Sequence, residues 1–332
     1  MPAPASWRLL ARVLLRLFGL AASLLAASAL IFAALELLPG NVAQLMLGTE
    51  ASPEAVAALA EQLGLQRPLW QRYLQWLQGL LSAELGDSYA YGAPVAQLIA
   101  ERLSVSLPLT ALALLLALAL ALACGCYAAA RQGRAGERWV LLLSQLGLAL
   151  PGFWLGILLM LLFALKLQWL PAGGFPGWGS EGADSGFAFW PALQALLLPA
   201  VALALVQAAQ LTRLLRAALL EVLGEDYIRS ARAKGLSPRV VLMRHALRNA
   251  LIPVLTLLGL QAAQLVAGAV VIEQLFQLPG LGQLIFQAIA NRDLIVLRNA
   301  LMLLVALVLL INFIVDALQT LIDPRLRREL PR

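Results

Sequence analysis

The chain has 332 residues, of which 61% are hydrophobic and 13% charged, and its formal net charge is +6. Soluble proteins carry charges at about a quarter of their positions, so this composition excludes an ordinary soluble domain and indicates an integral membrane protein. Several apolar runs reach about 20 residues, and no ladder of short alternating strands is present, so the spans are predicted to be helices.

The first apolar run covers residues 13–36, with Arg8 and Arg12 before it and Arg16 near its start. Ala27-Ser28-Ala29 within it resembles a signal-peptide cleavage site, which is the alternative interpretation. Because the run continues for the length of a full membrane crossing, we predict an uncleaved helix. Residues 1–36 are therefore expected to hold a short cytoplasmic end and the first span.

The segment 37–102 is more polar and carries helix signals of its own. Ser52 and Pro53 predict a helix with Ser52 as N-cap and Pro53 at its first position, and Gly64 predicts its end. A second run, PLWQRYLQWLQGLL (68–81), has aromatic and apolar residues at helical spacing, as is typical of the membrane interface. This segment is expected to pack on the helical bundle as a lid or to contact a ligand directly.

Five further apolar runs bring the expected number of transmembrane helices to six, at 103–130, 139–168, 192–222, 247–272 and 295–322. The fold class is thus all-α. Residues 103–322 are expected to form the core domain, and 323–332 a cytoplasmic tail.

Basic residues gather on one side of these spans, as expected for short cytoplasmic loops. Both termini and the connection 223–246 are therefore predicted to be cytoplasmic. The same bias explains the positive charge without a nucleic-acid partner, although contact with anionic lipid is an alternative for 223–246. Eighteen of the 24 Lys and Arg lie on the predicted cytoplasmic side: residues 8, 12, 16, 131, 134, 138, 213, 216, 229, 232, 234, 239, 244, 248, 325, 327, 328 and 332.

Motifs for catalysis are missing from the sequence. It has no phosphate-binding loop, no dinucleotide fingerprint and no HExxH, and no Ser or Cys has a recognisable neighbouring base. Cys124 and Cys126 lie two apart on one predicted helix, so they point to nearly opposite sides and are interpreted as core residues. We assign no catalytic residue and no metal site, and we expect the chain not to be an enzyme.

Polar residues form three faces on the predicted spans, where an unpaired polar group is costly. Each set follows helical spacing: Gln207 and Gln210; Gln261 and Gln264; and Asn312, Asp316 and Gln319. Hydrogen bonding between helices explains any single residue, whereas three faces in one bundle favour a translocation pathway. Asp316 is the only carboxylate well inside a predicted span.

For Asp316 we predict a partner at the cytoplasmic mouth, Arg213 or Arg216. A role in proton coupling is the alternative, but the predicted spans hold no His and no second buried acid with which it could form a relay.

The basic connection 223–246 predicts two short helices with a break. Gly235 is suited to the left-handed conformation that ends a helix, and Ser237-Pro238 is suited to start one that continues into the fifth span. Before the break, small and cationic side chains alternate from Arg229 to Lys234, so another surface could approach closely between flanking charges. A tethered DNA-reading helix pair and a lipid-facing loop are the alternatives.

The stretch DYIRSARAKGLSPRVVLMRHALRNALIPVL (226–255) resembles the EAA loop of ABC importer permeases, in the form found in the dipeptide/oligopeptide/nickel family. Arg229 and Ser230 depart from the usual pattern, whereas Ala231 and Gly235 fit it. The resemblance extends over nearly the whole chain: LELLPGNVA (35–43), GLQRPLWQRYLQWL (64–77), ELGDSY (84–89), PGFWLGILLMLLFALKLQWLPAGG (151–174), GAVVIEQLFQLPGLGQLI (268–285) and LIDPRLRR (321–328). Local departures are Asn41-Val42 and Leu294-Ile295.

The resemblance implies a type I ABC importer permease fold in the bacterial inner membrane, with 223–246 as the loop that docks on a separate ATPase. The implied coupling residues are Tyr227, Arg229, Ala231, Arg232, Ala233, Lys234, Gly235, Ser237 and Pro238. The implied periplasmic-face motif consists of Glu273, Phe276, Pro279, Gly280 and Gly282.

The resemblance also implies a set of partners: a homologous second permease, two ATPase subunits that bind ATP and Mg²⁺, a periplasmic substrate-binding protein, and membrane lipid. The chain itself is expected to bind no cofactor. Peptides are the expected cargo, with nickel chelates or opines as alternatives. A non-transport protein or an ion-coupled carrier with six helices is the alternative of another class.

Overall fold

The computed structural model describes residues 5–37, 44, 47, 52–62, 64, 66–179 and 189–322. These residues are almost all helical, and they form two compact units that are described separately. Unit 1 comprises Met1–Val105 and Pro279–Leu310, and unit 2 comprises Ser106–Leu278 and Ile311–Arg332.

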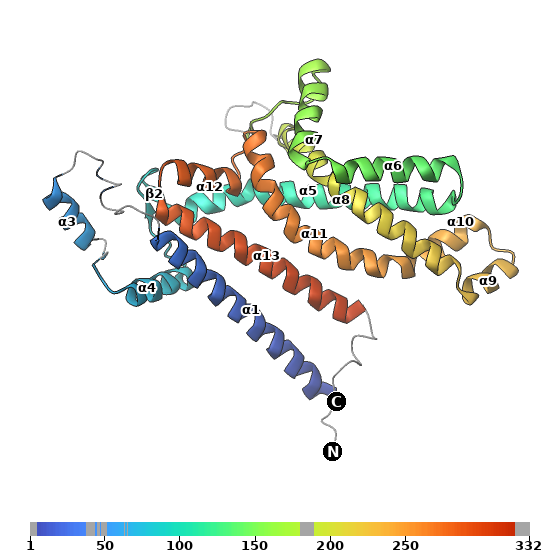
Figure 1. Cartoon of the computed structure of the whole chain (residues 1–332), viewed down its shortest axis with the longest axis horizontal. Helices are drawn as coiled ribbons and strands as arrows, with labels where there is room; N and C mark the ends of the chain where they lie inside the picture. Colours follow the sequence, from blue (N-terminus) through green and yellow to red (C-terminus); the bar gives the residue numbers. More distant parts are fainter. Residues whose placement is uncertain are drawn as a thin grey trace. The chain divides into compact units, whose positions relative to one another are not determined.

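Unit 1 contains helices from both ends of the chain (Figure 1). Its elements are α1 (Ala5–Glu36), α3 (Pro53–Gln62), α4 (Leu69–Ser82), β1 (Asp87–Ser88), β2 (Ala93–Pro94), α12 (Leu281–Ala290) and the first parts of α5 (Val95–Ala130) and α13 (Leu294–Ile322). The two strands pair antiparallel, with Asp87 opposite Pro94.

The predicted short helices of unit 1 are confirmed. Helix α3 begins at Pro53, and the Ser52 hydroxyl accepts a hydrogen bond from the Ala55 N–H at 3.2 Å, as an N-cap does. The helix ends before Gly64, which has a φ of 65°. Helix α4 covers the predicted aromatic run.

Two apolar clusters hold unit 1 together. In one of them α5, α12 and α13 meet through buried side chains, including Val95, Leu284 and Val296. Because Val95, Leu98 and Ile99 take part in this packing, α5 begins at Val95 and not at the predicted 103. In the other, Phe32 of α1 packs with Trp76 of α4.

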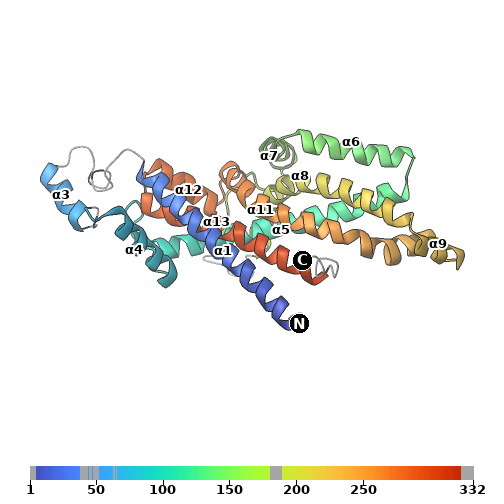
Figure 2. The same cartoon turned by 60° about the horizontal axis from the view of Figure 1, so that its bottom comes forward.

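Unit 2 contains the long helices α8 and α11, which lie side by side in Figures 1 and 2. Its elements are α6 (Ala135–Ala149), α7 (Gly152–Leu159), the π-helical η1 (Met160–Lys166), α8 (Phe189–Leu223), α9 (Asp226–Ala233), α10 (Pro238–Val240), the π-helical η2 (Val241–Ala246), α11 (Leu247–Leu275) and the remainders of α5 and α13. Buried small and aliphatic residues of α5, α8 and α11 form its core.

Among the described residues, five helices are long and apolar enough to span a membrane: Leu14–Glu36, Val95–Ala130, Phe189–Leu223, Pro238–Leu275 and Leu294–Ala317. The prediction of one continuous helix over 139–168 is wrong, because α6 and the α7–η1 helix meet at 106°. Pro151 lies at the bend and disfavours helical geometry at Leu150, which is extended with a ψ of 133°. If this bent pair is a single span, the number of spans is six.

Candidate functional site

The connection between α8 and α11, residues 223–246, is named here the coupling segment. Its first helix, α9, ends at Ala233, Gly235 follows with a φ of 81°, and the chain becomes helical again at Pro238. The predicted break and restart are therefore confirmed. Ser237 precedes the new helix and accepts the Val241 N–H through its backbone oxygen at 3.0 Å, while its side chain makes no capping bond.

Helix α9 has one buried face and one exposed face, and it lies beyond the end of α8 (Figure 1). Ile228 and Ala231 are buried in the core of unit 2, so the small size of Ala231 serves packing inside this chain. The Tyr227 hydroxyl accepts a hydrogen bond from the Asn249 side chain of α11 at 2.7 Å. The candidate residues on the exposed face are Tyr227, Arg229, Arg232, Ala233 and Lys234.

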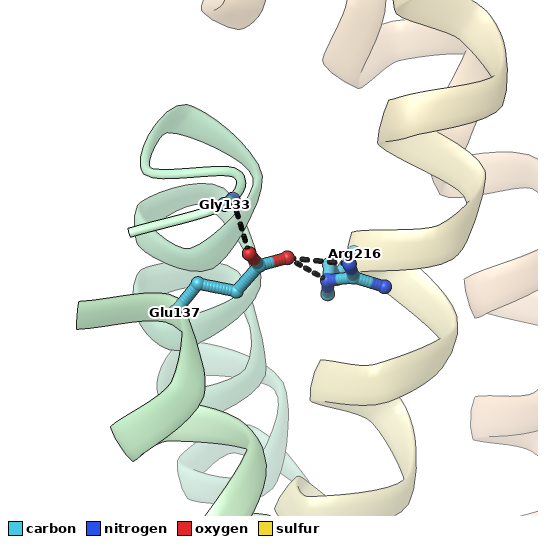
Figure 3. A network of polar contacts seen from close by, with 3 residues as sticks. All are labelled: Gly133, Glu137 and Arg216. Carbon is cyan, nitrogen blue, oxygen red and sulfur yellow. Dashed lines mark hydrogen bonds and ion pairs between the residues drawn. The ribbon is translucent and has the colours of Figure 1, made fainter. Parts of the chain in front are cut away.

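A buried ion pair braces the turn before α6 against α8 (Figure 3). The Glu137 carboxylate is only 5% exposed, and it accepts the Gly133 N–H through Oε2 and the Arg216 Nε–H through Oε1, both at 2.6 Å. The pair therefore ties the short basic turn to the helix that leads into the coupling segment.

The ion pair corrects the predicted partner of Arg216. We expected Arg213 or Arg216 to pair with Asp316, but Arg216 pairs with Glu137, and Arg213 donates to the Gln145 side chain at 3.1 Å. The sequence did contain a signal, because Glu137 is the lone acid in a turn crowded with arginines.

Two of the three predicted polar faces meet each other. The Gln261 side chain of α11 donates to the Gln210 side-chain oxygen at 3.0 Å and to the Gln207 backbone oxygen at 3.4 Å, both on α8. Gln261 and Gln207 are buried, whereas Gln264 is exposed. This contact favours hydrogen bonding between helices for Gln261 and leaves Gln264 as a candidate for the pathway.

Replacement of Gln261 tests this assignment. Gln261→Leu is expected to lower the melting temperature of the purified protein, because hydrogen bonds between membrane helices contribute about 0.6 kcal/mol and the partner Gln210 would lose its donor. Gln264→Leu is the matched control on the same helix and should leave the melting temperature unchanged. Equal shifts for the two variants would contradict the assignment.

The third face lies on α13. Asn312 is partly buried, and its side-chain oxygen has no hydrogen-bond partner among the described residues. Asp316 is exposed one turn further along, and the side chain of Gln319 lies outside the part of the chain that can be described. A pathway role for this face stays a prediction.

The motif around 273–282 divides between the two units. Glu273 lies in α11 and not in a loop, and its buried carboxylate accepts the Ser106 hydroxyl at 2.6 Å. Helix α11 thus extends past the predicted end at 272, and Glu273 lies in its last turn. Phe276 is buried, and its backbone oxygen accepts the Gly174 N–H at 2.9 Å.

The remaining residues of this motif lie in unit 1, whose second segment starts at Pro279. Pro279 is partly buried, and it is followed by Gly280 at the N-cap of α12, which accepts the Leu284 N–H through its backbone oxygen. Gly282 is buried in the first turn of that helix.

Sequence reasoning missed a buried carboxylate in unit 1. Asp293 is 0% exposed; its Oδ2 accepts the Ser88 hydroxyl at 2.6 Å and the Ala90 N–H at 3.3 Å, and its Oδ1 caps α13 through the Val296 N–H at 3.1 Å. The neighbouring Tyr89 hydroxyl donates to the Arg292 backbone oxygen. Burial, and then the charge of Asp293, raise the pKa of Tyr89 above its ordinary value. An acid directly before a predicted helix was the available signal.

Nothing in the described part of the chain groups three or more His, Cys, Asp or Glu side chains in a way that could hold a metal ion. Cys124 and Cys126 are both partly buried, and both are free thiols. The arrangement offers docking and packing surfaces: an anchored helix with exposed cations, and long helices joined by polar contacts.

Comparison with known proteins identifies the family. Residues 121–328 match the model of the binding-protein-dependent transport system inner membrane component, and residues 9–110 match the model of the N-terminal part of such membrane components. A transport system permease protein of Brucella abortus (strain 2308) is 42% identical over 298 residues, which are 90% of this chain and 93% of that protein.

Two further comparisons agree. The di/tripeptide transport system permease protein DppB of Pseudomonas aeruginosa (strain UCBPP-PA14) is 37% identical and is covered over 94% of its length by 90% of this chain. A chain of the MetNI methionine ABC transporter, in an inward-facing conformation, has the same fold with a TM-score of 0.55 at 22% identity, over 68% of this chain and 97% of that one. The chain therefore belongs to the family of binding-protein-dependent transport system inner membrane components, as a permease subunit that is not itself an enzyme.

Proposed function

We propose that this chain forms half of the translocation pathway of an ATP-driven importer that takes up peptides delivered by a periplasmic binding protein. The observation that carries this proposal is the full-length similarity to a di/tripeptide transport system permease. Nickel chelates and opines are the alternative cargoes. The rest of the complex would be a homologous second permease and two ATPase subunits that bind ATP and Mg²⁺.

The coupling segment supports a mechanism for this function. Helix α9 packs on the rest of unit 2 through the buried side chains of Ile228 and Ala231, and the Tyr227–Asn249 hydrogen bond joins it to α11. An ATPase that docks on the exposed face would therefore move α9 together with α8 and α11, rather than deform a loose loop. The exposed cations from Arg229 to Lys234 suit a docking groove with acidic character.

Gly235 is the proposed pivot of this movement. Its φ of 81° is a conformation that a β-branched residue rarely adopts, although a Cβ there would meet no atom within 4 Å. We therefore expect Gly235→Val to lower ATP-driven dipeptide uptake by about tenfold, since a misplaced coupling segment removes more than 1 kcal/mol of coupling free energy. The measurement is uptake and peptide-stimulated ATPase activity of the complete transporter in proteoliposomes.

Gly177→Val is the matched control, because Gly177 has a similar φ of 89° and equally open surroundings but lies outside the coupling segment. It should leave coupling unchanged. If Gly235→Val retains wild-type uptake and stimulated ATPase activity, or if no ATPase subunit co-purifies with the wild-type chain, the proposed coupling role is wrong.

The cargo is tested separately in the same proteoliposomes. Labelled dipeptide should accumulate in an ATP-dependent way when the cognate binding protein is present, and unlabelled dipeptide should compete. Accumulation of a nickel chelate or an opine without any competition by dipeptide would reject the peptide assignment and leave the permease function intact.

A further inference from the structure

Unit 1 contains a cavity of about 300 Å³ lined by α1, α4, the turn before β1 and the start of α13. None of the functions considered above uses it. The residues that matter here are Phe32, Glu36, Arg72, Trp76 and Arg298.

Arg298 brings to this cavity a guanidinium whose buried Nε has no hydrogen-bond acceptor among the described residues. Its guanidinium carbon lies 4.8 Å from the centre of the Trp76 ring and 6.0 Å from that of Phe32, and no described residue accepts a hydrogen bond from its buried Nε. The nearby Glu36 carboxylate is bonded to Arg72 at 2.5 Å. Glu84, the other carboxylate of the lining, is exposed. A buried cation is costly unless its N–H groups find acceptors, so the Nε of Arg298 still requires an acceptor.

The surroundings of Arg298 are rigidly built. The Trp76 indole N–H donates to the Asn299 side chain at 2.9 Å, and Asn299 donates to the backbone oxygens of Leu85 and Ile295. Both Trp76 and Asn299 are buried. The ring under the guanidinium is therefore fixed by a satisfied network that joins α4 to α13, as expected of a preformed site.

The elements around the cavity are those that meet the membrane. Helices α1 and α13 are both long and apolar enough to cross it, and the cavity lies at the end of one and the beginning of the other. On α4, the large apolar side chains Leu69, Trp70, Leu74 and Leu81 are exposed, which is typical of a helix lying at the level of the lipid headgroups. The phosphate of a lipid headgroup is thus the anion expected nearest to this cavity.

We propose that this cavity binds the phosphate of a phospholipid headgroup, with Arg298 as its principal ligand. The planar guanidinium can donate hydrogen bonds to two phosphate oxygens at once, and the Trp76 ring packs against the flat face of the guanidinium. The exposed apolar side chains of α4 would contact the acyl chains of the same lipid. Free inorganic phosphate has the same chemistry but gains nothing from this apolar surface. The inference concerns lipid binding alone and does not rest on the proposed cargo.

Native mass spectrometry of the full chain, purified with its transporter partners and stripped of lipid in detergent, tests the proposal. Dioleoylphosphatidylglycerol is added to one sample, dioleoylglycerol, which has the same chains without phosphate, to a second, and inorganic phosphate to a third. The wild type is expected to retain the phospholipid at least about tenfold more tightly than Arg298→Gln does, since hydrogen bonds to charged groups are the strong ones. Arg67→Gln, which removes an exposed cation before α4, should behave as the wild type.

Three results would overturn the proposal: equal phospholipid retention by the wild type and Arg298→Gln, equal retention of dioleoylglycerol and phospholipid by the wild type, or binding of inorganic phosphate without an Arg298-dependent lipid adduct. If Arg298→Gln does not fold, Arg298→Lys provides the test, because lysine keeps the positive charge but lacks the planar guanidinium that binds two phosphate oxygens. Retention should then fall by about threefold, and unchanged retention would equally overturn the assignment.

Discussion

Arg216→Met is expected to lower the melting temperature of the purified protein by about 5 °C, one of the two largest effects we predict for a single substitution. The substitution removes the guanidinium from a carboxylate that is only 5% exposed, so Glu137 would stay buried with only the Gly133 N–H as a described partner. Thermal unfolding followed by fluorescence-detected size-exclusion chromatography measures the shift.

A second variant separates the buried charge from lost packing. Adding Glu137→Gln to Arg216→Met should restore part of the stability, because the double variant no longer buries an uncompensated charge. Arg213→Met is the matched control on the same helix, since Arg213 is exposed and contacts only the neutral Gln145 among the described residues. Equal losses for Arg213→Met and Arg216→Met would show that the ion pair contributes nothing specific.

Local signals in the sequence were sufficient for most of the helices and for the break in the coupling segment. The length of the apolar runs predicted the spans, and Gly235 with Ser237-Pro238 predicted the break and the restart. These features depend on nearest neighbours along the chain, and they need no knowledge of what packs against them.

Proline shows where local signals fail. Pro151 lies at a bend of 106°, but Pro108, Pro199 and Pro253 lie inside continuous helices. The chemistry of the four residues is the same. Whether a helix continues through proline depends on neighbouring helices that stabilise the interrupted backbone, and that packing cannot be derived from the position of a proline in an apolar run.

The pairing of side chains was the part that the sequence left open. Glu137 meets Arg216 across 79 residues, and Gln261 meets Gln210 across 51. Spacing showed which residues share a helix face, but the rotation of one helix against another decides which faces meet. For the same reason the sequence suggested a docking role for Ala231, which lies on the buried face of α9.

The second large effect is expected at Asp293 in unit 1. Asp293→Ala should lower the free energy of unfolding by about 3 kcal/mol, because it removes the cap of α13 and leaves the Ser88 hydroxyl and two backbone N–H groups without their acceptor. Hydrogen exchange should rise in two places that are distant in sequence, the turn around 88–91 and the first turn of α13.

This paired readout distinguishes a shared acceptor from ordinary loss of a buried side chain, which would loosen only the surrounding core. Asp87→Ala removes an exposed carboxylate from the adjoining residue of β1 and should change neither region. Ser88→Ala should give a smaller loss, since Asp293 keeps both of its backbone N–H partners and only the Ser88–Asp293 and Tyr91–Ser88 hydrogen bonds disappear. If Asp293→Ala increases exchange in α13 but not in the turn, the carboxylate acts as a helix cap alone. The hydrogen bonds that it accepts from Ser88 and Ala90 then contribute nothing measurable to stability.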